Sequence, residues 1–188
     1  MILKVLAKLT DFTTIMVWKV FKLSGFMNTE LKVSKTCVDL VTKFEGYRPI
    51  PYICPAGYLT VGIGVRIKSK EDFLKKYPHG IPFSDAQKQL MAHMEKSVEP
   101  VIKLNVKVQL TQNQFDALAD FIYNLGEGAF KESTLLKLLN QNKYQEASEQ
   151  FKRWNKAKVN GHLVALAGLT RRRMADHLLF EDKEWRTV

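Results

Sequence analysis

The chain has 188 residues, of which 46% are hydrophobic and 26% are charged; this suits one domain, alone or with an appendage, and excludes a mainly disordered or collagen-like chain. Two cysteines, Cys37 and Cys54, exclude a disulfide scaffold, and no Cys/His cluster has metal-ligand spacing, so we expect no structural metal. The 29 basic and 19 acidic residues give a net charge of +10, which favours an anionic partner: nucleic acid, a membrane surface or a bacterial envelope polymer. The interpretation as a nucleic-acid-binding protein rests on charge alone, since the sequence contains no recognisable nucleic-acid-binding motif.

Residues 1–26 differ in composition from the rest of the chain and predict a basic amphipathic helix. Its charged residues fall on one face, namely Lys4, Lys8, Asp11, Lys19 and Lys22. These charges interrupt every stretch long enough to cross a bilayer, and the segment is also a poor cleavable signal. A helix lying in the membrane interface fits better, and the alternatives are a helix packed on the protein or an extension before a natural start at Met27.

From Met27 onward the sequence is typical of a compact domain, so we place a domain over residues 27–188. Apolar residues at helical spacing predict a helix over residues 34–45 that ends at Gly46. Residues 47–67 contain three prolines, three glycines and alternating apolar positions, which predict a small antiparallel sheet.

Helices are expected in the rest of the chain. Ser84 with Gln87 and Thr111 with Gln114 have the spacing of capping boxes, and each pair precedes an apolar stripe. Further helices are predicted at residues 133–140, 145–154 and 170–180. A small sheet followed by a helical lobe is an α+β arrangement, with a cleft expected between the two lobes.

Glu45 is the carboxylate in the most unusual predicted environment. It ends the first predicted helix, beside Phe44 and Tyr47, and directly precedes the sheet. The partial negative charge of a helix C-terminus and the apolar neighbours both disfavour an ionised carboxylate, and a general acid must keep its proton. The alternative is a surface glutamate that ends an ordinary helix.

Glu45 also begins a recognisable spacing: eight residues separate it from Cys54, and five separate Cys54 from Thr60. A chain that runs from the helix into the first hairpin can bring all three to one rim of the cleft. This Glu-x8-Asp/Cys-x5-Thr spacing resembles the active site of phage-type lysozymes, the endolysins of the muramidase family. Further segments are similar, in the family's order: FEGYR (44–48), PYICPAGYLTVGIGV (51–65), FIYNLGEGAF (121–130), STLLKLLNQ (133–141), Arg153-Trp154 and GLTRRRMAD (168–176).

The resemblance implies a role for each residue of the spacing. Glu45 would protonate the glycosidic oxygen, and Thr60 would hold the attacking water through its hydroxyl. Cys54 stands where many relatives carry Asp, and it would act either as a thiol that positions water or as a thiolate that stabilises charge. Cys54 has two other interpretations: a small, partly buried side chain, or a disulfide partner of Cys37. Because the resemblance places Cys54 in the cleft, we expect a thiol there.

The same resemblance implies supporting and substrate-binding residues. Val65 replaces the His that many relatives carry after Gly-x-Gly, and Arg172 matches the position that approaches the catalytic Glu. A guanidinium there favours the charged carboxylate and opposes the effect of burial. Tyr123 and Asn124 match an aromatic–amide pair that lines the cleft, and Arg153 is a candidate contact for substrate carboxylates.

Two residue types are assigned to structure rather than chemistry. Trp154, beside Phe151, is expected in the core. None of the four histidines has a partner at ligand spacing in the sequence, so all are interpreted as structural or exposed.

The resemblance implies an endolysin that hydrolyses the β-1,4 bond between N-acetylmuramic acid and N-acetylglucosamine in bacterial peptidoglycan. Acid catalysis and a positioned water suffice for this reaction, so no cofactor is expected. We expect a monomer, made in the infected host cytoplasm and active on the cell wall in the periplasm, whose residues 1–26 contact an anionic membrane or lipopolysaccharide. The alternatives are a lytic transglycosylase and an antibacterial protein that acts through its basic amphipathic helices.

Overall fold

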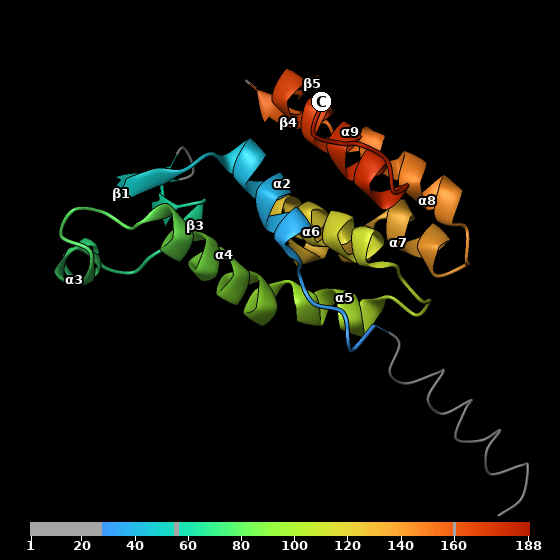
Figure 1. Ribbon diagram of the computed structural model, residues 1–188. Coiled ribbons are helices and arrows are strands. Elements are labelled where there is room, and N and C mark those ends of the chain that lie inside the picture. Colours follow the sequence, from blue (N-terminus) through green and yellow to red (C-terminus); the bar gives the residue numbers. More distant parts are fainter. Residues whose placement is uncertain (1–27, 55–56, 160) are drawn as a thin grey trace, which may run out of the picture.

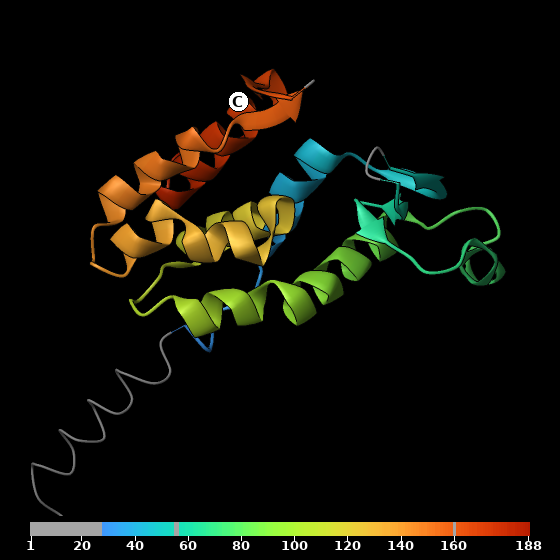
Figure 2. The same ribbon diagram turned by 180° about the vertical axis from the view of Figure 1, so that it is seen from behind.

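The sheet and the helices occupy opposite ends of the molecule. The computed structural model describes residues 28–54, 57–159 and 161–188. A three-stranded sheet with one short helix forms the smaller lobe, and α4 runs from this lobe to the helices of the larger one (Figures 1 and 2). In chain order the elements are α2 (Lys35–Glu45), β1 (Arg48–Ile53), β2 (Leu59–Gly62), β3 (Val65–Arg66), α3 (Lys70–Lys76), α4 (Phe83–Ser97), α5 (Glu99–Asn105), α6 (Gln112–Glu132), α7 (Thr134–Leu139), α8 (Tyr144–Gln150), the 3-10 helix η1 (Phe151–Arg153), β4 (Lys156–Val159), β5 (His162–Ala165) and α9 (Ala167–Phe180).

Helix α2 matches the first predicted helix closely. The Ser34 side chain caps it by accepting a hydrogen bond from the Thr36 amide, and its buried stripe packs on α6. Gly46 ends the helix with a φ of 73°, a left-handed conformation that glycine adopts without steric cost. The helix therefore stops at Glu45, and the chain turns directly into the sheet.

The sheet predicted for residues 47–67 is confirmed as the antiparallel order β1-β2-β3. Tyr52 pairs with Thr60, and Thr60 pairs with Arg66, so these three residues form one row across the strands. Residues directly opposite one another in a sheet point to the same face, and all three line the hollow described below. An irregularity in β1 separates Arg48 from Tyr52.

Helix α6 is the central helix of the larger lobe, and its N-terminus carries the capping box predicted at Thr111 and Gln114. The capping box predicted at Ser84 is wrong: α4 begins one residue earlier, with Pro82 at the N-cap and no side-chain cap. Helices α3 and α5 were not predicted. The Glu99-Pro100 start of α5 is a pattern favoured in a first turn, and it could have indicated this helix.

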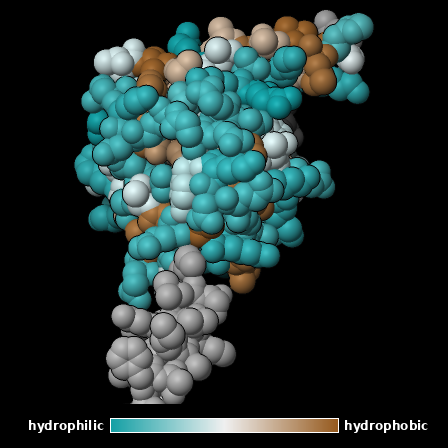
Figure 3. Space-filling model, turned by 90° about the vertical axis from the view of Figure 1, so that its right-hand side faces the viewer, coloured by the Kyte–Doolittle hydropathy of each residue, from teal (hydrophilic) through white to brown (hydrophobic). Residues whose placement is uncertain are grey.

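Helix α9 packs along α6 and completes the larger lobe. The hairpin of β4 and β5 that precedes α9 was also not predicted. It projects from the molecule, and Figure 3 shows hydrophobic side chains gathered over it at the top of the view. The exposed apolar residues in and beside the hairpin are Val159, Leu163, Val164 and Leu166.

The described chain begins beside α5 and α6. The Asn28 side chain donates to the Val108 carbonyl and accepts from the Leu110 amide, and Glu99 accepts from the Val33 amide. These bonds hold the segment that leads into α2. The helix predicted for residues 1–26, and the boundary at Met27, lie outside the described residues. Within the described residues no helix is long and apolar enough to span a membrane.

Candidate active site

A hollow of about 610 Å³ lies between the sheet and the helices. Ten residues line it: Glu45, Arg48, Tyr52, Cys54, Thr60, Gly64, Arg66, His93, Tyr123 and Asn124. They come from α2, all three strands, α4 and α6 and the segments beside them. The structure thus brings together five of the seven residues singled out in the sequence: Glu45, Cys54, Thr60, Tyr123 and Asn124.

Glu45 stands at the point where α2 meets the sheet, with 27% of its side chain exposed. One carboxylate oxygen, Oε1, lies 2.7 Å from Nη1 of Arg172, which reaches it from α9. Arg172 is buried and does not line the hollow, so it supports Glu45 from behind. This is the contact that the sequence resemblance predicted for Arg172.

Asp120 holds Arg172 in place. Its two oxygens accept hydrogen bonds of 2.9 and 2.8 Å from Nε and Nη2 of Arg172, a bidentate pairing that fixes the plane of the guanidinium. Burial alone would raise the pKa of Asp120, but Arg172 and then Arg173 outweigh it and lower the pKa below its usual value. Asp120 is therefore a charged, fully buried partner of Arg172.

The charge network continues deeper into the larger lobe. Arg173 is also fully buried; its Nη2 lies 3.2 Å from Asp120, and its Nε lies 2.9 Å from Asp176. Burial raises the pKa of Asp176 well above its usual value, despite the opposing charge of Arg173. Sequence reasoning missed both aspartates, although an acidic residue on the apolar face of a predicted helix indicates a buried partner.

Thr60 and Cys54 share one backbone acceptor. The Tyr58 carbonyl accepts a 2.9 Å hydrogen bond from the Cys54 amide and a 3.0 Å hydrogen bond from the Thr60 hydroxyl. The Thr60 hydroxyl group therefore donates its hydrogen bond to the backbone, and the lone pairs of its oxygen stay available to accept hydrogen bonds. Cys54 is half-buried and Cys37 is fully buried in α2, and no disulfide joins them.

Tyr123 ties the two lobes together at the hollow. Its hydroxyl donates a 2.9 Å hydrogen bond to the Ile63 carbonyl, in the turn between β2 and β3. Burial, and then the Glu45 charge, raise the pKa of Tyr123, so it stays a neutral donor. Gly64, with a φ of 72°, lies against it: a Cβ at this position would come within 2.9 Å of the Tyr123 hydroxyl and 3.3 Å of Glu45 Oε2.

Arg153 is not brought to this site. It is exposed on η1, where its guanidinium lies 3.3 Å from the Gln150 side chain, and it does not line the hollow. Trp154 packs edge-on against Phe121 at 5.4 Å between ring centroids, which supports its assignment to the core.

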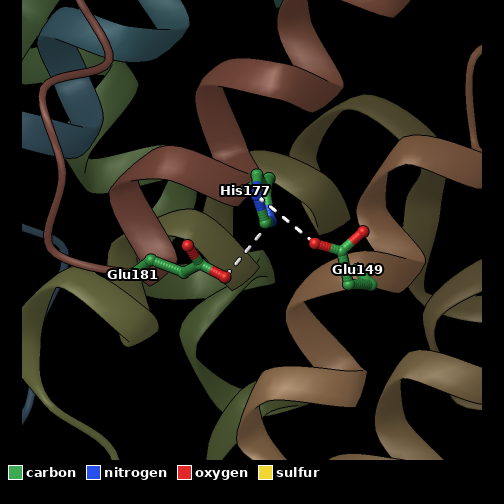
Figure 4. A group of neighbouring side chains, drawn as sticks. All are labelled: Glu149, His177 and Glu181. Atoms are coloured by element: carbon green, nitrogen blue, oxygen red, sulfur yellow. Dashed lines mark ion pairs between the residues drawn. The ribbon is translucent and has the colours of Figure 1, made fainter.

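The interpretation of the histidines needs one correction. His93 is exposed, as expected, and it lines the hollow with its ring edge-on to Tyr123. His177 does have partners at ligand spacing, because Glu149 and Glu181 each lie 3.7 Å from one of its ring nitrogens (Figure 4). Glu181 follows His177 by one helical turn, a spacing that was visible in the sequence.

The contacts around His177 account for this cluster without an ion. Ser148 Oγ lies 2.7 Å from the imidazole Nδ1, Lys152 pairs with Glu149 at 2.9 Å, and Lys183 pairs with Glu181. These bonds join α8 to α9 and the C-terminal segment, and we interpret them as structural.

Comparison with known proteins identifies the family of this fold and site. Residues 42–176 match the family model described as phage lysozyme. The chain belongs to the phage lysozyme family. The matched segment of this lysozyme includes every residue of the hollow and the whole buried network from Asp120 to Asp176.

The relatives cover most of this lysozyme. It is 38% identical over 156 residues to an endolysin of Acyrthosiphon pisum secondary endosymbiont phage 1, covering 80% of this chain and 99% of that relative. It is 39% identical over 113 residues to a SAR-endolysin of Escherichia phage Mu, covering 58% of this chain and 60% of the relative. Among solved structures it resembles the muramidase domain of SpmX from Asticaccaulis excentricus, with a TM-score of 0.70 and 32% identity over 80% of this chain and 98% of that one. The predicted lysozyme-like α+β fold is confirmed.

Proposed function

We propose that this protein hydrolyses the β-1,4 bond between N-acetylmuramic acid and N-acetylglucosamine in bacterial peptidoglycan, with Glu45 as the proton donor. Family membership supports a peptidoglycan-cleaving glycosidase of the endolysin type. The single observation that carries the assignment to Glu45 is its position: among the residues that the structure describes, it is the one carboxylate that lines the hollow, where a glycan strand can reach it.

The proposed reaction needs only a proton and a water molecule. Glu45 gives its proton to the glycosidic oxygen as the bond to the muramic acid C1 breaks. Water attacks that carbon: one of its hydrogens stays in the hydroxyl of the new reducing end, the other leaves as a proton to solvent, and Glu45 regains a proton from solvent. The Thr60 hydroxyl donates to the Tyr58 carbonyl, so its oxygen can accept a hydrogen bond from this water and leave a lone pair of the water directed at the sugar. Cys54 lies on the same rim, as a thiol that positions water or as a thiolate that stabilises positive charge.

The supporting groups keep Glu45 in place. Arg172 holds one carboxylate oxygen, and Asp120 takes two of the hydrogen bonds of Arg172, so Glu45 faces a guanidinium that is already partly neutralised. Tyr123 holds the turn that carries Gly64 against the carboxylate. We assign Tyr123 and Asn124 to the substrate wall of the larger lobe, and Arg153 has no contact with the hollow to support the substrate role that the sequence suggested.

End-group analysis of digested peptidoglycan tests this proposal. The wild type should release reducing muramic acid ends, and E45Q, which keeps the shape of the side chain, should lose at least about a thousandfold in rate because general acid catalysis is removed. Circular dichroism should show the same fold for both proteins. A 1,6-anhydro product would exclude hydrolysis, and an E45Q variant that digests walls at the parental rate would exclude Glu45 as the donor.

The site of action follows from the substrate, and the route to it is part of the proposal. Endolysins act on the cell wall, and we propose that this protein is made in the host cytoplasm, works as a monomer in the periplasm, and contacts an anionic membrane or lipopolysaccharide through residues 1–26. The SAR-endolysin name of one relative supports an export step. Removing residues 1–26 should leave digestion of purified peptidoglycan intact and weaken killing of cells with an outer membrane; unchanged killing would contradict the membrane contact.

A further inference from the structure

The sheet side of the hollow carries two arginines, one on each strand that flanks β2. Arg66 lies directly opposite Thr60 in the β2–β3 pairing, and Arg48 lies opposite Gly62 in the β1–β2 pairing. Both line the hollow, and among the described residues Glu45 is the only acidic one that lines it with them. This wall of the cleft is therefore strongly positive.

Each of the two guanidiniums is stacked on a tyrosine of the smaller lobe: Tyr52 lies in β1, and Tyr58 directly precedes β2. The guanidinium carbon of Arg66 lies 3.5 Å from the ring centroid of Tyr58, and that of Arg48 lies 4.4 Å from the ring centroid of Tyr52. Stacking restricts the plane of an arginine side chain while its N–H groups stay free to donate at the edge. Both side chains are thus ordered before any ligand arrives.

Among the described residues, neither guanidinium forms an ion pair or a hydrogen bond. Arg172 and Arg173 differ in this respect, because buried aspartates meet their charges. Two ordered and unpaired guanidiniums at the edge of a cleft fit planar carboxylates, which accept two parallel N–H bonds from one arginine.

We propose that Arg48 and Arg66 are specificity-determining residues that bind carboxylates carried by the glycan, so that the enzyme prefers strands with free carboxylates over strands whose carboxylates are neutralised. This inference rests on the proposed function. Peptidoglycan carries such groups only on muramic acid, either as the lactyl carboxylate of a sugar without peptide or as the free carboxylates of its peptide. The shared chemistry is a carboxylate carried by the muramic acid, either on its lactyl group or on the peptide joined to that group.

The test compares rates on three soluble glycan preparations. The first keeps its peptides, the second has the carboxylates of those peptides converted to amides, and the third has its peptides removed by an amidase so that the lactyl carboxylate is free. Values of kcat and KM are measured for the wild type, R48Q, R66Q, the double variant R48Q/R66Q and E45Q. R186Q is the matched control, because Arg186 is also an exposed arginine stacked on an aromatic ring, Trp185, and lies outside the hollow.

The wild type should cleave the peptide-bearing strands with a kcat/KM about tenfold above that for the amidated strands, the ratio that one charge-assisted hydrogen-bonding pair supplies. R48Q/R66Q should lose this preference through a raised KM, each single variant should lose part of it, and R186Q should keep it. If the peptide-free strands keep the preference, the lactyl carboxylate is the ligand; if they lose it, the peptide carboxylates are. Both results support the assignment.

A wild type that cleaves amidated and native strands equally would overturn the inference, as would a double variant that keeps the wild-type ratio. An equal loss in R186Q would overturn it as well, because the preference would then come from net charge. E45Q separates this failure from failure of the proposed function: an inactive E45Q with an unchanged ratio in R48Q/R66Q removes only the inference, whereas an active E45Q removes the assignment of the proton donor.

Discussion

The arginines of α9 and the arginines of the sheet carry the same charge in opposite surroundings. Arg172 and Arg173 are buried and bound by Asp120 and Asp176. Arg48 and Arg66 are exposed, stacked on tyrosines and without acidic partners among the described residues. A buried guanidinium must be matched by carboxylates, because an isolated charge in the interior is very costly, and once matched it is fixed. An exposed one bears no such cost and can bind a ligand.

The comparison therefore separates a framework from a binding surface. The α9 side holds Glu45 through a chain of ion pairs, and the sheet side carries the arginines that we propose bind the substrate. Three changes test this division, and they are taken from the largest expected effect to the smallest.

Replacing Asp120 by asparagine should cause the largest loss of stability. D120N keeps the size of the side chain but removes the charge that Arg172 and Arg173 share. The free energy of unfolding should fall by about 3–5 kcal/mol, the usual cost of leaving a buried charge without its partner. Urea unfolding near neutral pH measures it.

The control for D120N is an aspartate in an exposed ion pair. Asp85 lies 3.3 Å from Lys88 on the surface of α4, and D85N should change the free energy of unfolding by less than about 1 kcal/mol. Equal losses in the two variants would show that the buried network is not the framework we describe.

Replacing Gly64 by alanine tests the contact between the two walls. The added Cβ would stand 2.9 Å from the Tyr123 hydroxyl and 3.3 Å from Glu45 Oε2, so the carboxylate or the turn must move. We expect a fall of about 100-fold in kcat from misplacement of the proton donor, and a loss of about 1–2 kcal/mol from the left-handed backbone. Steady-state kinetics and urea unfolding measure the two effects.

Gly161 provides the matched control. It has a φ of 86° in the β4–β5 turn and has nothing within 4 Å of the position a Cβ would take. G161A should share the backbone cost and keep full activity. If G64A were as active as G161A, the close approach at Gly64 would have no role in positioning Glu45.

The smallest expected effect is on the pH dependence of stability, and it comes from His93, which lines the hollow near the exposed Arg66. Partial burial of its ring, and then the charge of Arg66, lower the pKa of His93 from the ordinary value of 6.5. The folded protein then binds this proton less readily than the unfolded chain does, so the free energy of unfolding should fall as the pH is lowered from about 7.5 to about 5.5. H93Q should show a smaller fall than the wild type, and H162Q, at an exposed hairpin position, should match the wild type. An identical pH dependence in all three proteins would contradict the coupling between His93 and Arg66.

Local pattern was enough to predict much of the fold and the centre of the site. The stripe in α2, the turn at Gly46 and the alternation in the sheet are signals within a few residues of one another, and they place Glu45 and Thr60 at one rim. The contact between Arg172 and Glu45 spans 127 residues, and the family resemblance, rather than any local pattern, predicted it.

What sequence reasoning missed depends on packing between distant elements. In the sequence, Asp120 is a single acidic residue within a predicted helix. Its partner Arg172 lies 52 residues later in the chain, and only the packing of α9 brings the two side chains together. In the sequence, Arg48 and Arg66 are two separate charges; the strand pairing brings them to the two strands that flank β2, opposite Gly62 and Thr60 respectively. Arg153 was expected at the cleft because it is an arginine in a matching segment, and the 3-10 turn points it toward Gln150 instead.

The position of Arg172 in the last helix has a consequence for the order in which the enzyme comes into being. Glu45, Cys54 and Thr60 leave the ribosome first, and the arginine that holds Glu45 is translated 127 residues after it. A nascent chain therefore carries the proposed proton donor long before its support exists, and the ion pair between Glu45 and Arg172 forms only once α9 has emerged and docked on α6.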